Sequence, residues 1–444
     1  MITQICALLQ DKKILILGFG REGKSTYRFI RKHFPDKPVG IYDKKAIDEE
    51  LQNVTIHGGD SFDGLLQEYE LVIKSPGIIL NPEDRGLLSR ITSQTDLFLD
   101  YYRSQTIGIT GTKGKSTTAS LLYHILHEAG KDAVLVGNIG IPVFDMLEKI
   151  GKNTLVVFEI SSHQLEYVTH SPHIGVLLNI YQEHLDHYGT FEKYVSAKQN
   201  IYHFQQEGDL LIYNRKFVKK EEEFKAEIIT ITNSEEDADA VIKDNKICYQ
   251  GHEIEIQEQD ILLMGQHNLY NIGAAYVAAK VCGITDGEFA GAIRTFKPLP
   301  HRMEYVAQIN GVTFYNDSIS TICETTIQAA LSIKNIDTVI LGGMDRGISY
   351  EPLVDFLAAS EIRNIILMPD TGYRIQKLMK NHETDRKNCN IFMVANVEEA
   401  VLAAKKETQP GKTCLFSPAA ASYGFFRDFE ERGEIFKRLV LSNN

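Results

Sequence analysis

A glycine-rich stretch, GTKGKST, occupies residues 111–117 and has the composition of a phosphate-binding loop. It follows the apolar segment TIGIT and precedes a segment with helical periodicity, STTASLLYHILHEAG. In this order, glycines bring backbone N–H groups close to phosphate oxygens, and the helix N-terminus adds positive potential. Lys115 adds a charge, and the Ser116 hydroxyl can coordinate Mg²⁺. The stretch is shorter than the G-x-x-x-x-G-K-[ST] pattern, which would need glycine at Ile109, but its context favours ATP binding.

A second glycine turn, GFGREG at residues 18–23, matches the dinucleotide fingerprint G-x-G-x-x-G, with an acidic residue further on at Asp43. Taken alone, the turn indicates NAD binding. The same geometry accepts any diphosphate, and this chain has a separate candidate ATP loop. We therefore interpret the turn as the site of a nucleotide-linked substrate.

Candidate metal ligands follow two further apolar segments. Glu159 ends the apolar part of VVFEISSHQLE, and His184 follows LLNIYQE. Ligands of open α/β sheets bind beyond the carboxyl ends of the strands. Mg²⁺ prefers oxygen ligands, so Glu159 suits it better than His184, for which a structural role is the alternative.

Short apolar segments alternate with helix-like segments along the chain, which predicts an α/β fold with parallel sheets. Three domains are expected: a Rossmann-like domain over 1–104, a central P-loop ATPase-type domain with a parallel sheet over 105–298, and a Rossmann-like domain over 299–444. The two prolines of FKPLPHRME mark the second boundary. The clearest strands are expected in ILIL, VGIYD, ELVIK, TIGIT, NTLVVFEI, HIGVLLNI, DTVILGG, NIILMPD and KTCLFSP.

Composition excludes several classes of function. The 444 residues carry a formal net charge of −12, which argues against a nucleic-acid footprint. No apolar run approaches the roughly 20 residues of a membrane helix, and the N-terminus does not resemble a signal peptide, so we expect a cytoplasmic protein without membrane insertion. The six cysteines form no C-x-x-C pair, which disfavours zinc and disulfide frameworks.

Nine motifs in order and at family-like spacing resemble the Mur ligases, the ATP-dependent enzymes that build the peptidoglycan stem peptide. The family's phosphate loop has the short form T-G-x-x-G-K-[ST], as here. The SPG turn at 75–77 and the compact N-terminal domain are most similar to members that add D-glutamate to UDP-N-acetylmuramoyl-L-alanine. The resemblance covers essentially the whole chain. The motifs are GTKGKST, NIG, EISSHQLE, LNIYQEHLDHYGTFEKYVSAK, GQHNLYNIGAA, PHRME, NDS, GGMDRG and SPAAASYGFFRDFEERG.

The resemblance implies a role for each matching residue. The catalytic residues would be Lys115, Asn138, His184 and Lys198. The UDP substrate would bind to Gly18, Gly20, Arg21, Glu22, Gly23, Asp43, Ser75 and Gly77, with Asn138 at its sugar-linked part. ATP would bind to Gly111, Thr112, Lys113, Gly114, Lys115, Ser116 and Thr117, with Asn268 and Asn271 on the adenine side and Arg302 and Asp317 nearby. The incoming amino acid would be held by Thr321, Arg346, Ser422, Tyr423 and Phe429.

Two Mg²⁺ sites are also implied, one at Ser116 and Glu159 and one at His184 and Lys198. In the family the matching lysine is carbamylated, which converts a cation into an oxygen ligand suited to a hard metal. Lysine can lose its proton where its surroundings disfavour charge. The implied reaction phosphorylates the substrate carboxylate with ATP, and the amino group of glutamate then attacks the acyl phosphate. The domains of a monomer would close to bring the reactants together.

The C-terminal motifs depart from the family pattern. The usual NDSKATN is NDSISTI here, so Ile319 and Ile322 replace a lysine and an asparagine, and Arg346 replaces the lysine of GGxxK. Gly424 stands where an aspartate is usual. An arginine still binds a carboxylate, but its geometry differs from that of lysine.

These departures leave other functions open. The chain could be a paralogue that adds L-glutamate or another amino acid to the same UDP-muramoyl substrate, or a non-catalytic nucleotide-binding paralogue. A folylpolyglutamate-type ligase is disfavoured because it needs no N-terminal diphosphate-binding domain. An NAD-dependent oxidoreductase would leave the ATP loop and the Lys198 region without a role.

Overall fold

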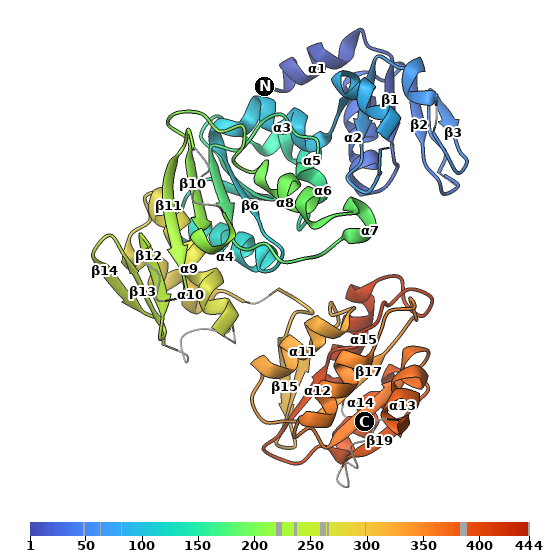
Figure 1. Ribbon diagram of the computed structural model, residues 1–444, viewed down its shortest axis with the longest axis vertical. Coiled ribbons are helices and arrows are strands. Elements are labelled where there is room, and N and C mark those ends of the chain that lie inside the picture. The colour runs from blue at the N-terminus through green and yellow to red at the C-terminus, as the bar shows by residue number, and fades with distance from the viewer. Residues whose placement is uncertain are drawn as a thin grey trace. The chain divides into compact units, whose positions relative to one another are not determined.

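The computed structural model describes residues 1–47, 49–62, 64–80, 82–218, 224–234, 238–257, 263, 266–297, 299–381 and 389–442. It has three β-sheets, one within each of the three predicted domain ranges (Figure 1). The first two sheets belong to one compact unit of the chain and the third sheet to another. The predicted α/β class is confirmed, whereas the domain boundaries stay a prediction.

The N-terminal sheet has five parallel strands in the order β3-β2-β1-β4-β5, as expected for a doubly wound unit. Every residue of β1 and β2 is buried, because helices cover a parallel sheet on both faces. Strand β3 is partly exposed, and its mixed sequence VTIH did not predict a strand. The strands are β1 (Ile14–Leu17), β2 (Val39–Tyr42), β3 (Val54–His57), β4 (Leu71–Lys74) and β5 (Ile91–Thr92). The helices are α1 (Ile2–Gln10), α2 (Arg21–His33) and α3 (Gln94–Tyr102), with 3₁₀ turns η1 (Leu65–Glu68), η2 (Pro82–Arg90) and η3 (Arg103–Gln105).

The central sheet has nine strands in the order β14-β13-β12-β11-β10-β9-β6-β8-β7. From β12 to β7 all neighbours are parallel, and β13 and β14 extend the sheet as antiparallel strands that the sequence analysis did not predict. The strands are β6 (Thr106–Thr110), β7 (Ala133–Gly137), β8 (Leu155–Glu159), β9 (Ile174–Leu177), β10 (Leu210–Asn214), β11 (Glu227–Thr232), β12 (Ala240–Lys243), β13 (Lys246–Tyr249) and β14 (His252–Glu255). The helices are α4 (Lys115–Glu128), α5 (Val143–Met146), α6 (Ser162–Leu165), α7 (Leu185–Tyr188), α8 (Phe191–Gln199), α9 (Gln266–Val281) and α10 (Asp286–Thr295), with 3₁₀ turns η4 (Leu147–Lys149) and η5 (Arg215–Phe217).

The C-terminal sheet has six strands in the order β15-β16-β20-β17-β18-β19, parallel except for the β15–β16 hairpin. The strands are β15 (Glu304–Ile309), β16 (Val312–Asn316), β17 (Ile336–Gly342), β18 (Asn364–Met368), β19 (Asn390–Met393) and β20 (Thr413–Phe416). The helices are α11 (Cys323–Ser332), α12 (Glu351–Ala359), α13 (Thr371–Asn381), α14 (Val397–Glu407) and α15 (Phe429–Leu441).

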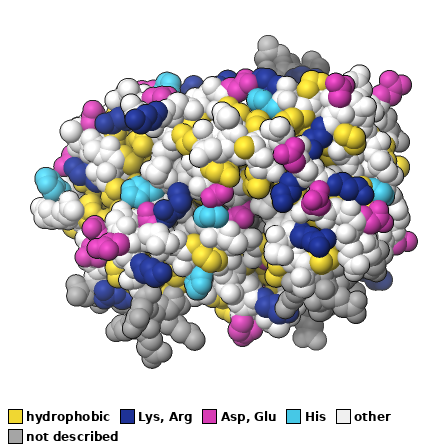
Figure 2. All heavy atoms as spheres, turned by 90° about the horizontal axis from the view of Figure 1, so that it is seen from above, with side chains coloured by type: hydrophobic (Ala, Val, Ile, Leu, Met, Phe, Trp, Pro, Cys, Tyr) yellow, Lys and Arg dark blue, Asp and Glu magenta, His cyan; other side chains and the backbone are white. Residues whose placement is uncertain are grey.

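Within the described residues, the helices are all too short or too polar to cross a membrane. On the face of the molecule in Figure 2, Lys and Arg side chains are interspersed with Asp and Glu side chains.

Candidate active site

Four loops meet at the carboxyl edge of the central sheet. Strands β9, β6, β8 and β7 are neighbours in that order and run parallel, so the segments that follow them lie side by side. These segments carry most of the residues to which the sequence analysis assigned chemistry. They are the phosphate loop after β6, Asn138 after β7, Glu159 at the end of β8 and His184 beyond β9.

The phosphate loop is held by its neighbours. The Lys115 Nζ donates to the carbonyl oxygens of Gly111 at 2.8 Å and Thr112 at 3.0 Å. The side chain of Asn179 accepts from the Lys113 N–H at 2.8 Å and donates back to the Lys113 carbonyl. The Thr112 hydroxyl lies 2.9 Å from the Tyr194 hydroxyl. The loop is thus shaped before a nucleotide binds, with Ser116 and Thr117 in the first turn of α4.

Gly114 connects this loop to the predicted adenine-side residues. Its φ is +87°, and a Cβ there would lie 2.2 Å from the Asn271 Oδ1, so only glycine fits. Asn271 donates to Asn268 at 3.0 Å, and both side chains are buried. Helix α9 therefore brings Asn268 and Asn271 to the phosphate loop, although about 150 residues separate them in the chain.

The Glu159 side chain is fully buried, and only one of its two carboxylate oxygens has a hydrogen-bond partner among the described residues. Its Oε1 accepts a hydrogen bond from the Asn138 side chain at 2.9 Å. Its Oε2 is buried without a hydrogen-bond partner among the described residues. A buried carboxylate oxygen without a partner is costly, so the atom has the character of a ligand for a cation or a donor that arrives with the substrate.

Lys198 is the other buried charge at this edge. Helix α8 places it with 1% exposure, its Nζ 2.8 Å from the Gly111 carbonyl and 4.9 Å from the centroid of the Tyr194 ring. Burial, and then the nearby Lys115 ammonium, lower the pKa of Lys198 well below its ordinary value. The amine can therefore become neutral and nucleophilic, which the predicted carbamylation requires.

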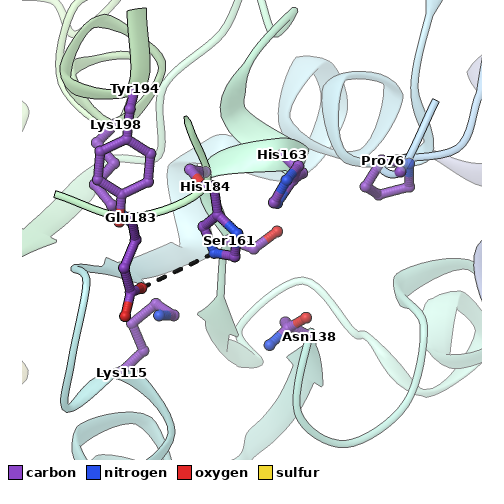
Figure 3. A pocket seen from close by; sticks show the side chains of 11 residues that line it. Pro76, Lys115, Asn138, Ser161, His163, Glu183, His184, Tyr194 and Lys198 are labelled. Atoms are coloured by element: carbon purple, nitrogen blue, oxygen red, sulfur yellow. Dashed lines mark ion pairs between the residues drawn. The ribbon is translucent and has the colours of Figure 1, made fainter. Parts of the chain in front are cut away.

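One pocket of about 350 Å³ collects these groups (Figure 3). It contains all four predicted catalytic residues and Gly77 from the SPG turn at residues 75–77, named the UDP turn below because the UDP substrate is predicted to bind there. The His184 Nε2 lies 3.9 Å from a carboxylate oxygen of Glu183. The pocket also contains residues that the sequence analysis did not assign, although several flank recognised motifs. These are Pro76, Ser161, Ser162, His163, Glu183 and Tyr194.

The turn at residues 18–23 is closed by two side chains predicted to act there. The Asp43 Oδ2 accepts from the Phe19 N–H at 2.6 Å, and the Ser75 hydroxyl donates to the Gly18 carbonyl at 2.7 Å. A Cβ at Gly23 would lie 2.1 Å from the Gly18 carbonyl oxygen. Asp43 and Ser75 therefore shape the turn, which begins α2 with Gly20 as its N-cap.

Arg21 and Glu22 point from this turn to the central sheet domain. Arg21 donates to the carbonyl oxygens of Gly137 and Asn138, each at 2.8 Å. Glu22 accepts from Gln164 at 2.7 Å, and burial raises its pKa. These side chains connect the two domains and hold the segment of Asn138, while their direct contact with UDP stays a prediction.

Lys74 is a buried residue of this region that sequence reasoning missed. Its Nζ donates to the carbonyl oxygens of Ser75 and Pro76, each at 3.3 Å, and lies 5.0 Å from the centroid of the Tyr167 ring. Burial lowers the pKa of Lys74 to about 8. Lys74 is the last residue of β4, and its place at the carboxyl end of the apolar segment ELVIK is a signal that the sequence analysis did not use.

The remaining predicted residues lie in the second unit, at the carboxyl edge of strands β16, β20 and β17. Asp317 is buried and accepts from the Met303 N–H at 3.2 Å and the Ser417 hydroxyl at 2.7 Å. The Arg302 Nε is buried without a hydrogen-bond partner among the described residues. Arg302 and Asp317 are thus neighbours at one sheet edge.

The amino-acid residues follow the same edge. The exposed Arg346 guanidinium donates to the Thr321 carbonyl at 2.9 Å. Ser422 is buried, Tyr423 is 62% exposed, and Phe429 begins α15. The sequence analysis missed a fully buried arginine that connects these loops. It is Arg432, which donates to Ser318 Oγ at 3.0 Å, to the Ser318 carbonyl at 2.7 Å and to the Ala420 carbonyl at 3.0 Å.

We expect the unfolding free energy of the unmodified protein to change with pH as Asp317 titrates, and this change to be absent in the variant Asp317→Asn. Burial raises the pKa of Asp317 from 3.8 to about 6. The folded chain therefore holds this proton more tightly than the unfolded chain, so the contribution to stability is full below about pH 4 and is lost as the pH rises through about 6. From about pH 5 to about pH 7.5, the unmodified protein should lose about 1 kcal/mol of unfolding free energy relative to the variant. Urea denaturation at both pH values measures this, and parallel pH profiles would contradict it.

Comparison with known proteins gives the family. Residues 109–279 match the model of the Mur ligase middle domain. The chain is 34% identical to the UDP-N-acetylmuramoylalanine–D-glutamate ligase of Geobacillus kaustophilus, over 97% of this chain and 98% of the relative. It is 34% identical to the protein of that name from Lactobacillus acidophilus, over 97% of each chain. The protein of that name from Listeria monocytogenes is 33% identical, over 97% and 96%.

Solved structures agree in fold. The UDP-N-acetylmuramate-alanine ligase MurC of Thermotoga maritima superposes with a TM-score of 0.61 at 18% identity, over 96% of this chain and 98% of that chain. The MurF ligase of Thermotoga maritima in complex with ADP gives a TM-score of 0.60 at 16% identity, over 96% and 94%. At such identities, the likeness shows the three-domain fold alone.

Fold and site together define an enzyme that uses ATP to join two substrates. The full-length relatives make this class specific: the chain belongs to the Mur ligases, the ATP-dependent ligases of peptidoglycan precursors. The predicted family, fold class and ligase activity are confirmed.

Proposed function

We propose that this ligase adds D-glutamate to UDP-N-acetylmuramoyl-L-alanine, with ADP and phosphate as the other products. The observation that carries the proposal is the pocket in which the ATP-loop residue Lys115 and the buried Lys198 share one cavity with Gly77 of the UDP turn. A carboxylate linked to UDP could thus reach the ATP loop. The full-length relatives named as D-glutamate ligases support this choice of amino acid.

Two residues of the chain are proposed to act on the substrates directly, one by orienting the muramoyl part and one by neutralising charge. Asn138, held by Glu159 and Arg21, would orient the muramoyl part of the substrate, and Lys115 would neutralise charge on the transferred phosphoryl group. A carboxylate oxygen attacks the γ-phosphorus, the bond to ADP breaks and an acyl phosphate forms. The glutamate amine then attacks the acyl carbon, loses a proton and expels phosphate.

The donor set fits Mg²⁺, which family membership implies. The Glu159 Oε2, buried without a partner among the described residues, can serve as an oxygen ligand. Ser116 lies in the first turn of the adjacent helix, and His184 lines the pocket. We propose Ser116 and Glu159 for one ion, and His184 with a carbamate on Lys198 for the other. Bound there, Mg²⁺ would supply positive charge to the phosphate oxygens. The carbamate forms when the neutral Lys198 amine adds CO₂ and releases a proton.

The proposed function is tested by phosphate release from ATP in the presence of UDP-N-acetylmuramoyl-L-alanine and D-glutamate, L-glutamate or no amino acid. We expect release with D-glutamate only, so that Arg346 replaces the usual lysine without changing the amino acid. Release with L-glutamate only would show that the exposed Arg346 serves a pocket for the other stereoisomer. No release with either amino acid would contradict the proposal and favour another acceptor or a non-catalytic paralogue. The cytoplasmic location and monomeric state stay predictions.

We expect the variant Glu159→Gln to lose stabilisation by Mg²⁺ without losing its fold. The Gln carbonyl can still accept from Asn138, while the buried negative charge disappears. In thermal unfolding without metal, the variant should melt at or above the temperature of the unmodified protein. Millimolar Mg²⁺ with ATP should raise the melting temperature of the unmodified protein by mass action, and should raise that of the variant much less. Equal shifts of the melting temperature in both proteins would show that Glu159 is not a ligand of the metal ion.

A further inference from the structure

His163 is a pocket residue for which the mechanism above has no role. It lies in α6, two residues after Ser161, and Figure 3 shows it between Pro76 of the UDP turn and His184. A ligand that extends from the UDP turn to the ATP loop would pass its ring.

The His163 ring is held by packing and not by hydrogen bonds. Its centroid lies 4.8 Å from that of His184, 4.3 Å from that of His187 and 5.5 Å from that of Tyr188. His187 is fixed in turn by Glu166 at 2.8 Å. The hydrogen bonds of the described residues include none to a ring nitrogen of His163. Among the described residues, neither ring nitrogen of His163 is a buried atom without a partner, so the nitrogens stay open to the pocket, where a ligand can reach them.

Packing alone does not explain a histidine at this position. The three aromatic contacts would be made equally well by phenylalanine, which has no nitrogen to desolvate. The nitrogens are therefore best explained by a partner that arrives with a ligand. Whether neutral or protonated, a histidine ring has at least one N–H that can donate to such a partner.

The charges around the ring indicate the sign of that partner. Lys115 shares the pocket with His163, and the Lys74 ammonium acts on the ring electrostatically. Glu183 is the one acidic residue in the described lining of the pocket. The charges of Lys74 and Lys115 therefore attract an anionic group to this part of the pocket.

We propose that His163 is a substrate-binding residue that donates its ring N–H to an anionic oxygen of the UDP-linked substrate. The oxygen belongs either to the diphosphate or to the carboxylate at the far end of the muramoyl group. Only the identity of the UDP-linked substrate rests on the proposed function. His163 would thus add affinity and orientation beyond what Asn138 provides.

The test is the variant His163→Phe, which keeps the aromatic packing and removes the N–H. Isothermal titration with UDP-N-acetylmuramoyl-L-alanine should show affinity about ten- to a hundredfold lower, as expected for a lost hydrogen bond to a charged group. The affinity for ATP should not change, which also shows that the variant is folded. His163→Gln, which keeps an N–H donor, should recover part of the affinity and provides a second test if the phenylalanine variant does not fold. The matched control is His203→Phe, the same replacement at an exposed histidine outside the pocket.

Titration with UDP distinguishes the two oxygens. If UDP also binds more weakly to His163→Phe, the partner is the diphosphate; if only the full substrate does, the partner is the carboxylate. Unchanged affinity for both ligands would overturn the proposal. Because these are binding measurements, a failure of D-glutamate ligation in the unmodified protein would contradict the proposed function and leave this inference standing.

Discussion

In the variant Lys198→Ala, the rate of D-glutamate-dependent phosphate release should fall by at least about a thousandfold. The variant lacks a proposed ligand of the Mg²⁺ whose charge would stabilise phosphoryl transfer. The structure makes this residue unusual among the lysines: its side chain is 1% exposed, beside the phosphate loop, and its pKa is well below the ordinary value. A lysine kept only for packing would not need an amine at this position.

Chemical rescue distinguishes the carbamate from a simple ammonium. Acetate or another short carboxylic acid should restore part of the activity of Lys198→Ala, because it returns two oxygens to the place of the carbamate. The matched control is Lys193→Ala, which removes an exposed lysine of the same helix and should leave activity unchanged. If acetate does not restore activity while Mg²⁺ still stabilises the variant, Lys198 does not act as a carbamate.

The sequence predicted those parts of the site that depend on the edge of a parallel sheet. Continuous apolar segments such as ILIL and TIGIT are buried on both faces, so their strands and the polar residues at their carboxyl ends could be located. Lys115, Glu159 and His184 accordingly lie where expected, whereas Asn138 follows β7, a strand that was not predicted, and was assigned only through the family resemblance. Strands with exposed faces, such as β3 and β14, have mixed sequences and were missed.

The missed site residues depend on contacts between distant segments. Lys74 ends an apolar strand, and it contacts the ring of Tyr167, which lies more than 90 residues further along the chain. Arg432 connects loops more than 100 residues apart in sequence, which no local pattern indicates. Tyr194 could have been found, because it precedes Lys198 by one turn of α8 and so shares its face.

Arg21 shows why a motif can be found while the contacts of its side chains cannot be predicted. The pattern GFGREG predicted a diphosphate turn, and the structure has the turn at the start of α2. Its variable positions, however, are free to serve the particular chain. Here Arg21 donates to the backbone of Gly137 and Asn138, so the turn and the segment of Asn138 are connected through one guanidinium.

The second large effect is expected for Lys115→Ala, which should lower kcat/KM for ATP by a factor of about a thousand or more while the fold is retained. In the free protein, the Lys115 ammonium is held by the Gly111 and Thr112 carbonyl oxygens, so it is already at the phosphate loop. The loss should appear in kcat as well as in KM, because charge builds on the phosphoryl oxygens in the transition state.

The fold of Lys115→Ala should be retained because the loop keeps its other supports. Asn179 holds the backbone of Lys113 on both sides, and the Thr112 hydroxyl stays on Tyr194. Circular dichroism and the affinity for the UDP-linked substrate should therefore match those of the unmodified protein. Lys131→Ala, an exposed lysine just beyond the far end of α4, is the control that should keep full activity. Near-normal activity in Lys115→Ala would mean that residues 111–117 are not the ATP loop, since no arrangement of the remaining loop amides replaces a full positive charge on the transferred group.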